Sequence, residues 1–438
     1  MKFQIPKGLF DILPYNAVEN WRLSEYWQHV ETVMRKIARD YAFQEIRTPV
    51  FEKAELFDRG VGEATDIVSK EMYVFEDKAK RSLALRPEGT SSVMRAFVER
   101  SLYTYSKINK LFYIAPMFRY ERPQAGRYRQ HHQFGVEAIG NASFEQDVEI
   151  IDMLWELYKR LGLKNLTLHL NSIGDPGCRE SFKKVLSEFL TPHFDSLSEE
   201  SKVRFKKNIL RIFDSKDPKD QEILQNAPSI LDYLSDDAKK HFDGVCHLLG
   251  KINVPFEINP KIVRGLDYYN RTVFEITTKE LGAQSTIGAG GRYDGFTSVF
   301  GGPSLPGIGF GCGIERVLQV MLRQNVPFPK LSNPFVYFIA LGDRANEFCF
   351  TLLTKLRHAH LPCEMSFNTK KVQEGLKKAN QLMAQYAVVI GDNEIASNQV
   401  CLKHMIDRKE NKITLANLFQ TLLHLWSKNE HPTVQTYT

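Results

Sequence analysis

The chain has 438 residues, of which 43% are hydrophobic and 25% are charged, and its net charge is +6. These values are typical of a globular protein with two or three domains, and so mild a charge permits a nucleic-acid partner without indicating one. The six cysteines lie far apart without a Cys-x-x-Cys pair, which excludes a disulfide framework and a zinc site. No apolar run suits a signal peptide or a membrane span, so we expect a cytoplasmic protein.

The first third of the chain predicts helices around a set of short strands. Apolar residues recur at steps of three and four over 16–42, which favours an amphipathic helix, and 46–51 resembles a strand at a sheet edge because it contains Pro49. Four alternating runs follow, with connections too short for crossover helices, so we expect antiparallel strands. These runs are 71–76, 81–86, 111–121 and 130–139, and a helix is expected over 144–161.

The pattern changes at about residue 174. Helical periodicity dominates 174–255, which we interpret as a helical insertion containing the basic stretch 202–211. Strand signals resume at 256–277, followed by glycine-rich 288–313 and a helix from 314. Prolines at 327, 329 and 334 indicate a linker, and the alternation of strand and helix signals from 335 to 426 predicts a small α/β domain with a mostly parallel sheet.

The most informative stretch is 116–137, which combines apolar alternation with four arginines around a Pro-Gln-Ala-Gly turn at 123–126. The arginines are Arg119, Arg122, Arg127 and Arg129. Such a pattern predicts a hairpin, and the guanidinium forks suit bidentate binding of phosphate. Gln133 and Glu137 are an even number of residues apart, so they would share one face of a strand. A solvated basic surface hairpin is the alternative.

Residues 86–90, Arg-Pro-Glu-Gly-Thr, predict a strand end followed by a helix start. Thr90 could cap that helix, which is a structural role. Glu88 is less easily explained in that way, and a carboxylate beside a hydroxyl suits the binding of an α-amino group.

Residues 263–275 gather an arginine, an aspartate and two tyrosines beside a glycine, a mixture that is unusual for a structural turn. The structural alternatives are an Arg264–Asp267 ion pair and tyrosines that line a sheet. Arg316 adds a guanidinium at the end of the glycine-rich region, which matches neither a Rossmann nor a P-loop pattern. The residues alone therefore indicate a phosphate-handling enzyme.

The chain resembles the histidyl-tRNA synthetases of class II over nearly its whole length. Residues 6–14 resemble the opening of these enzymes, and 48–51 resemble motif 1, which builds the class II dimer interface. Motif 2 corresponds to 116–137 and motif 3 to 309–316. The stretches 263–269 and 289–295 resemble segments peculiar to the histidine enzymes, which makes the resemblance specific.

The resemblance implies an α+β fold: an antiparallel sheet flanked by helices, in a catalytic domain at 1–325 with the helical insertion at 174–255. A C-terminal α/β anticodon-binding domain is expected at 333–430. It also implies histidine activation by ATP and transfer to histidine tRNA by a homodimer without a membrane partner. Mg²⁺ is expected with ATP, although its ligands cannot be assigned.

Residue roles follow from the same resemblance. Arg119 and Arg264 are expected on the α-phosphate as catalytic cations, and Arg316 on the γ-phosphate. Glu88, Thr90 and Gln133 are expected to bind the amino group of histidine. The imidazole contacts and pocket wall are expected from Glu137, Tyr268, Tyr269 and Tyr293. Arg122 and Gln124 are expected at the tRNA acceptor end.

Two other functions are compatible with parts of this pattern. The synthetase-like regulatory subunit of ATP phosphoribosyltransferase lacks the C-terminal domain and usually loses catalytic arginines, whereas residues 335–426 and Arg264 are present here. A threonyl or prolyl enzyme would share the C-terminal domain. The two histidine-specific stretches and the absence of a zinc-ligand cluster argue against it.

Overall fold

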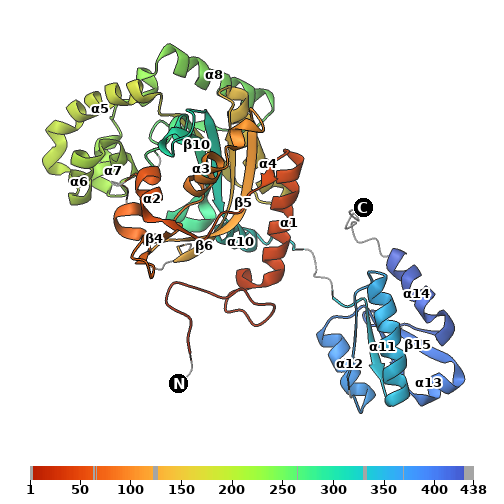
Figure 1. Ribbon diagram of the computed structural model, residues 1–438. Coiled ribbons are helices and arrows are strands. Elements are labelled where there is room, and N and C mark those ends of the chain that lie inside the picture. The colour runs from red at the N-terminus through yellow and green to blue at the C-terminus, as the bar shows by residue number, and fades with distance from the viewer. Residues whose placement is uncertain are drawn as a thin grey trace. The chain divides into compact units, whose positions relative to one another are not determined.

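The computed structural model describes residues 3–62, 65, 67–121, 127–263, 265–328, 333–367 and 369–428. The chain divides into two compact units, Met1–Phe328 and Pro329–Thr438 (Figure 1). Each unit has its own sheet and its own apolar core, and each is described by itself below.

An eight-stranded sheet forms the centre of the first unit. The strands, in spatial order, are β1 (Gln44–Glu45), β5 (Asn109–Phe118), β6 (Gln130–Ile139), β11 (Gly307–Gly313), β10 (Thr286–Arg292), β9 (Asn270–Thr278), β7 (Leu166–Ser172) and β8 (Glu257–Ile258). Pairing is antiparallel from β5 through β7, and only the short edge strands β1 and β8 pair in parallel. The expected α+β fold on an antiparallel sheet is confirmed.

Strand β6 carries the alternation on which the function depends. Phe134, Val136 and Ala138 are buried in the core on one face of the sheet. Because side chains alternate along a strand, Gln133 and Glu137 point to the other face. The predicted run 130–139 coincides with β6, and 111–121 largely coincides with β5, which pairs with it from Asn109 to Phe118.

Helices cover the apolar face of this sheet. The helices of the first unit outside the insertion are α1 (Ser24–Asp40), α2 (Ala54–Val61), α3 (Thr90–Glu99), α4 (Phe144–Arg160), α9 (Phe296–Val299) and α10 (Ile314–Arg323). Of these, α1, α4 and α10 supply the core that contains Phe134. The prediction for 144–161 is confirmed, but the helix expected from residue 16 begins at Ser24. The preceding segment is held in a bridge, in which the Ser24 N–H donates to the Leu13 carbonyl at 2.8 Å.

A separate three-stranded sheet contains β2 (Phe51–Lys53), β4 (Ser82–Leu85) and β3 (Val74–Glu76) in antiparallel order β2-β4-β3. The single strand expected over 46–51 is wrong, since β1 ends at Glu45 in the large sheet and β2 begins at Phe51 in the small one. Pro49 has no N–H to donate to a ladder, which suits a connection between sheets. The run 71–76 is a strand only from Val74, because residues 67–71 form one turn of π-helix.

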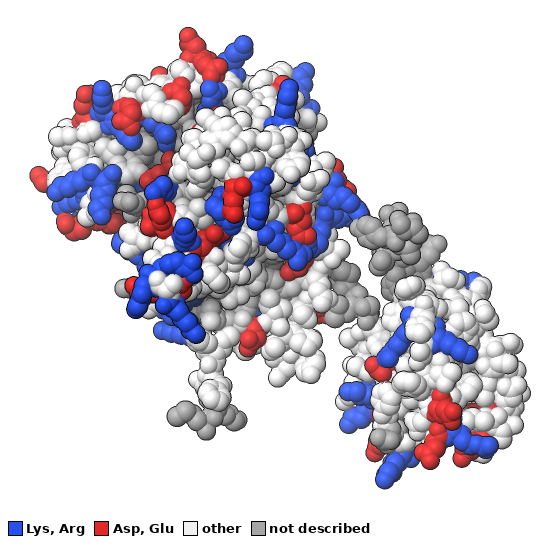
Figure 2. Space-filling model, in the orientation of Figure 1, with Lys and Arg blue, Asp and Glu red and all other residues white. Residues whose placement is uncertain are grey.

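The insertion is helical, as expected. Its helices are α5 (Pro176–Leu190), α6 (Glu199–Lys207), α7 (Pro218–Leu224) and α8 (Asp236–Lys251), which gather at the upper left of Figure 1. The basic stretch 202–211 is partly neutralised from the preceding turn: Lys202 pairs with Glu199 at 2.8 Å, and Arg204 with Glu200 at 2.7 Å. Figure 2 likewise shows basic and acidic side chains interspersed over the visible face.

The second unit contains a five-stranded sheet of order β13-β12-β14-β15-β16. Its elements are β12 (Val336–Ala340), α11 (Asp343–His358), β13 (Cys363–Met365), α12 (Val372–Gln381), β14 (Tyr386–Ile390), α13 (Asp392–Ser397), β15 (Gln399–His404), β16 (Glu410–Thr414) and α14 (Leu415–Lys428). The α/β class is as expected. The sheet is not mostly parallel, because β14–β15 and β15–β16 pair antiparallel. The connection from Ile390 to Gln399 contains only the short helix α13, whereas a crossover between parallel strands needs a longer segment.

Candidate active site

A cavity of about 250 Å³ lies over the face of the large sheet to which Gln133 and Glu137 point. Nine of the residues singled out from the sequence line it together. They are Glu88, Thr90, Arg119, Gln133, Glu137, Tyr268, Tyr269, Tyr293 and Arg316. They come from six separate segments of the chain, so the fold gathers residues that are more than 200 positions apart. Arg122, Gln124 and Arg264 lie outside the described residues.

Glu137 is the centre of a buried hydroxyl cluster. Its carboxylate accepts hydrogen bonds from the Thr90 hydroxyl at 2.8 Å, from the Tyr113 hydroxyl at 3.4 Å and from the Tyr293 hydroxyl. Tyr268 packs edge-on against the Tyr293 ring, with 5.8 Å between the ring centroids. The cluster offers a ligand one carboxylate enclosed by aromatic walls.

The environment of Glu137 changes its protonation. Burial raises the pKa of this carboxyl to about 8, the neighbouring Glu88 carboxylate adds to the rise, and the hydrogen bonds from Tyr293 and Thr90 oppose it. Burial, reinforced by the Glu137 charge, also raises the pKa of the Tyr293 hydroxyl well above its usual value. The tyrosine is therefore a neutral hydrogen-bond donor at pH 7. A carboxyl poised near neutrality suits a site that recognises a titratable ring.

Glu88 and Thr90 make structural contacts that the sequence did not suggest. The Glu88 carboxylate, not the Thr90 hydroxyl, accepts hydrogen bonds from the first N–H groups of α3, Thr90 N at 2.6 Å and Ser91 N at 2.8 Å. Glu88 thus has the capping role for which Thr90 was considered, and a helix N-terminus favours a negative charge there. Thr90 instead orients Glu137.

Glycines on the neighbouring strand form the floor of the cavity. Gly309 and Gly311 of β11 pair with Glu137 and Gly135 of β6. A methyl group at Gly309 would collide with the Glu137 carboxylate, and one at Gly311 would collide with the Gln133 amide. The glycine-rich sequence is therefore required because polar side chains lie across the strand. Residues 286–292 and 307–313 form strands and not a phosphate-binding loop.

A second group in the cavity is cationic. The Arg119 Nε donates to the Pro87 carbonyl at 2.9 Å, and Arg316 Nη1 donates to the Thr286 carbonyl at 2.8 Å, which fixes both guanidinium groups. Arg127 also lines the cavity and pairs with Glu121 at 3.2 Å. Burial lowers the pKa of Arg316, and the Arg127 and Arg119 cations lower it further, yet an arginine stays charged at pH 7. Several cations held close together suit a polyphosphate.

The cavity extends along β6 from His131, which is close to the charges of Arg119 and Arg316, to Glu137. His131 and Glu137 are six residues apart on β6, which corresponds to roughly 20 Å at about 3.3 Å per residue. Gln133 lies between them. An elongated ligand could therefore place a polyphosphate among the arginines and a small polar ring beside Glu137.

Comparison with known proteins agrees with this geometry. Residues 9–317 match the family model described as histidyl-tRNA synthetase, and 336–425 match one described as an anticodon binding domain. The chain belongs to the histidyl-tRNA synthetase family. The cavity, the insertion and the large sheet all lie within the first match.

Relatives of the family match the chain from end to end. A histidine–tRNA ligase of Protochlamydia amoebophila is 54% identical over 96% of this chain and 100% of its own length. One of Caldanaerobacter subterraneus is 46% identical over 95% of this chain and 98% of its own length. The crystal structure of apo histidyl-tRNA synthetase from S. aureus covers 96% of this chain and 100% of its own, with 32% identity and a TM-score of 0.81.

Sequence patterns missed several members of the cavity in this synthetase-family chain. His131 lines the cavity with Arg119 and Arg316, and burial followed by these two cations lowers its pKa well below the usual value, so the ring is neutral. Glu121, which lines the cavity, was also missed, as was Tyr113, which does not line it but contacts Glu137. The alternation along β5 and β6 was the available signal, because His131 shares the parity of Gln133 and Glu137.

Two observations on the described residues concern metals and membranes. Within that part of the chain, no group of three or more His, Cys, Asp or Glu side chains is arranged to hold a metal ion. None of the helices formed by these residues combines the length and the apolar character needed to cross a bilayer.

Proposed function

We propose that this protein joins L-histidine to histidine tRNA in two steps, through a histidyl-adenylate. The observation that carries the proposal is a single cavity that holds both fixed arginines and a buried carboxylate among hydroxyls. Membership of the synthetase family and the 46–54% identity to histidine–tRNA ligases over nearly full length support it.

In the first step, a carboxylate oxygen of histidine bonds to the α-phosphorus of ATP while the bond to the bridging oxygen of diphosphate breaks. Negative charge grows on the non-bridging oxygens, and preorganised cations lower that barrier. In this proposal Arg119 and Arg264 act on the α-phosphate and Arg316 on the γ-phosphate. The backbone carbonyls that hold Arg119 and Arg316 support such preorganisation.

We propose that Glu137 and the hydroxyl groups around it recognise the histidine side chain. A neutral imidazole has one N–H and one bare nitrogen, so the Glu137 carboxylate and a tyrosine hydroxyl can read both. Tyr268, Tyr269 and Tyr293 would form the walls of the pocket. Glu88, Thr90 and Gln133 remain proposed contacts of the amino group. Glu88 would serve through lone pairs that are not used by the N–H groups of α3.

In the second step, the histidyl group passes to the 3′-terminal adenosine of the tRNA, and AMP leaves. Arg122 and Gln124 are proposed to contact the acceptor end. We also propose that residues 1–325 form the catalytic domain, that 174–255 are its insertion, and that 333–430 bind the anticodon, for which the match at 336–425 gives support.

Mg²⁺ is proposed to arrive with ATP, because this hard ion binds phosphate and carboxylate oxygens. The Glu315 carboxylate lines the cavity. Its Oε1 accepts from the His132 N–H at 2.8 Å, whereas its buried Oε2 has no hydrogen-bond partner among the described residues. Glu315 therefore fits the role of a ligand, and the ion would neutralise phosphate charge there.

The regulatory subunit of ATP phosphoribosyltransferase is the less supported alternative. A Bacillus halodurans structure titled as such a regulatory subunit or a histidyl-tRNA synthetase shares the fold at 19% identity and a TM-score of 0.62. The match of residues 336–425 to the anticodon binding model favours the synthetase.

The test of the proposed function is ATP–pyrophosphate exchange with each of the twenty amino acids in turn. We expect exchange with histidine alone, because other side chains would leave Glu137 and its hydroxyls unpaired in the cavity. Exchange with threonine or proline, or no exchange with histidine, would contradict the proposal. Charging of histidine tRNA then tests the second step.

A homodimer is proposed from an apolar surface on the small sheet. Phe51 lies opposite Leu85, and Phe75 lies opposite Leu83, so these four side chains share one face of the sheet. The two phenylalanine rings meet edge-on, with 6.1 Å between their centroids. Phe51 is 52% exposed and Phe75 is 42% exposed. The surface includes Phe51 of the motif 1 segment, and clustered exposed apolar groups indicate an interface.

Replacing both Phe51 and Phe75 with Glu is expected to raise the dissociation constant of the dimer at least about 100-fold. Loss of apolar burial at each ring costs about 1.5–3 kcal/mol, and 1.4 kcal/mol corresponds to a factor of ten. Sedimentation equilibrium measures the change. Tyr105→Glu is the matched control, because Tyr105 is 84% exposed and lies outside the patch. A variant that dimerises like the wild type would place the interface elsewhere.

A cytoplasmic location is also proposed. All six cysteines are unpaired, and four of them are buried. Unpaired thiols are expected in a reducing compartment, which supports the proposal.

A further inference from the structure

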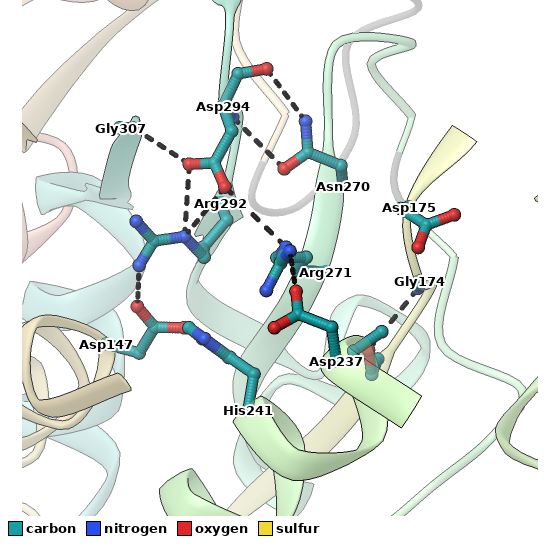
Figure 3. Close-up of polar contacts among 12 residues, drawn as sticks. Asp147, Gly174, Asp175, Asp237, His241, Asn270, Arg271, Arg292, Asp294 and Gly307 are labelled. Carbon is teal, nitrogen blue, oxygen red and sulfur yellow. Dashed lines mark hydrogen bonds and ion pairs between the residues drawn. The ribbon is translucent and has the colours of Figure 1, made fainter. Parts of the chain in front are cut away.

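A buried polar network connects segments that also carry cavity residues, and none of its own members lines the cavity (Figure 3). Its centre is Arg292, the last residue of β10, which is fully buried. The guanidinium pairs with Asp147 in the first turn of α4 and with Asp294 at 3.1 Å, and it donates to the Asn141 carbonyl at 2.6 Å. Burying an arginine is costly unless its donors are satisfied, so this arrangement requires a fixed geometry.

The network also reaches the insertion. The second oxygen of Asp147 lies 2.8 Å from His241 Nε2 on α8, and Arg271 pairs with Asp237 at the start of the same helix. Figure 3 places His241 beside Asp147 and Asp237 beside Arg271. Helix α8 is therefore bound at two points, once to α4 through Asp147 and once to β9 through Arg271.

The outer part of the network joins two tyrosine-bearing segments. The Asp294 N–H donates to Asn270 Oδ1 at 3.1 Å, and Asn270 Nδ2 donates back to the Asp294 carbonyl at 3.0 Å. Asn270 directly follows Tyr269, and Asp294 directly follows Tyr293. The paired hydrogen bonds thus fix the separation of two cavity walls. The Asp294 carboxylate also accepts from the Gly307 N–H at 3.0 Å, which attaches the start of β11.

The strand bends at this junction. The register of β10 with β9 slips between Gly291–Val273 and Arg292–Asn270, so a bulge contains residues 271 and 272. Arg271 has a φ of 49°, in the left-handed region that non-glycine residues rarely adopt. Its backbone is held there by two 2.8 Å hydrogen bonds, to Gly174 and from Ile173. Bulges of this kind redirect neighbouring side chains next to active sites.

We propose that Asn270, Asp294 and Arg292 are positioning residues, which hold Tyr269 and Tyr293 around Glu137 for histidine recognition. The inference rests on the proposed function, because it concerns how the histidine pocket keeps its shape. None of the three residues lines the cavity. The residues proposed for ATP are held by other contacts, Arg119 by Pro87 and Arg316 by Thr286. Loss of the network therefore affects histidine and leaves ATP binding intact.

The test compares Michaelis constants in histidine-dependent ATP–pyrophosphate exchange. Asp294→Ala is expected to raise the KM for histidine at least roughly 10-fold, the effect of about 1.4 kcal/mol, with little change in the KM for ATP. Asp294→Asn keeps an oxygen for the Gly307 and Arg292 donors and is expected to restore most of the histidine affinity. Asn270→Ala is the second variant, and it should show the same selective rise even if Asp294→Ala does not fold.

Tyr41→Phe is the control for destabilisation alone. It removes the 2.5 Å hydrogen bond to Asp152 on α4, the helix that also carries Asp147, without touching the network. A smaller folded fraction lowers the rate but leaves both Michaelis constants unchanged. If the Asp294 and Asn270 variants behave like Tyr41→Phe, the positioning role is wrong. If the wild type shows no histidine-dependent exchange, the proposed function itself fails, which is a separate result.

Discussion

Arg119→Ala is expected to slow histidyl-adenylate formation roughly 10²–10³-fold, the usual effect of removing one preorganised donor from a developing oxyanion, about 3–4 kcal/mol. Arg119 follows β5, and its backbone N–H donates to the Arg129 carbonyl at 3.0 Å across the hairpin. The Pro87 carbonyl fixes its Nε. The cation therefore needs little reorganisation when charge appears on the α-phosphate. The KM values should change little, because the contact strengthens only after charge has moved.

Single-turnover adenylate formation at saturating substrates measures this effect, and circular dichroism checks the fold. Arg119→Lys should recover only part of the rate, since an ammonium group keeps the charge but loses the fork. Arg129→Ala is the matched control in the same hairpin: Arg129 lies 4.1 Å from the centre of the Tyr120 ring and does not line the cavity. Equal losses in the Arg119 and Arg129 variants would indicate a structural defect of the hairpin.

Glu137→Gln is expected to weaken histidine binding roughly 10- to 100-fold while leaving ATP binding nearly unchanged. Glutamine has almost the same shape and can still accept from Thr90 and Tyr293, but it loses the charge that the imidazole N–H would meet. Hydrogen bonds to charged groups contribute about 1.5–3 kcal/mol, which gives this range. Glu149→Gln is the control, since Glu149 pairs with Lys110 outside the cavity. Calorimetric titration with histidine measures the difference.

The Glu137→Gln variant also tests how histidine affinity depends on pH. The folded protein raises the Glu137 pKa from 4.5 to about 8, so folding disfavours the ionised form, and stability falls as pH rises from about 4.5 through 8. An imidazole N–H favours the ionised form, so histidine binding should release a proton at pH 7. Affinity should then rise between pH 7 and 8.5 in the wild type and stay flat in Glu137→Gln. A rise of equal size in both would assign the titration to another group.

Much of the site could be read from residue patterns. Alternation predicted β6 within its true bounds and placed Gln133 and Glu137 on one face. Periodicity predicted α4 to within a residue, because its apolar face packs on a sheet. The arginines around 119–129 indicated phosphate, and the histidine-specific stretches at 263–269 and 289–295 indicated the family. These features are local, so the chain displays them without its fold.

Only the tertiary structure decided the hydrogen-bond partners, the protonation and the packing of the site residues. Glu88 caps α3, and Thr90 turns to Glu137, because the N–H groups of the helix N-terminus need an acceptor and the buried Glu137 carboxylate needs a donor. The raised pKa of Glu137 follows from burial, which sequence alone does not give. Gly309 and Gly311 are needed only because Glu137 and Gln133 cross the strand above them. Arg292 pairs with Asp147 of α4, and the 145 positions between them along the chain hid this contact. Local patterns determine the elements and the chemical class of this protein, whereas packing between distant segments determines the charge and shape of its site.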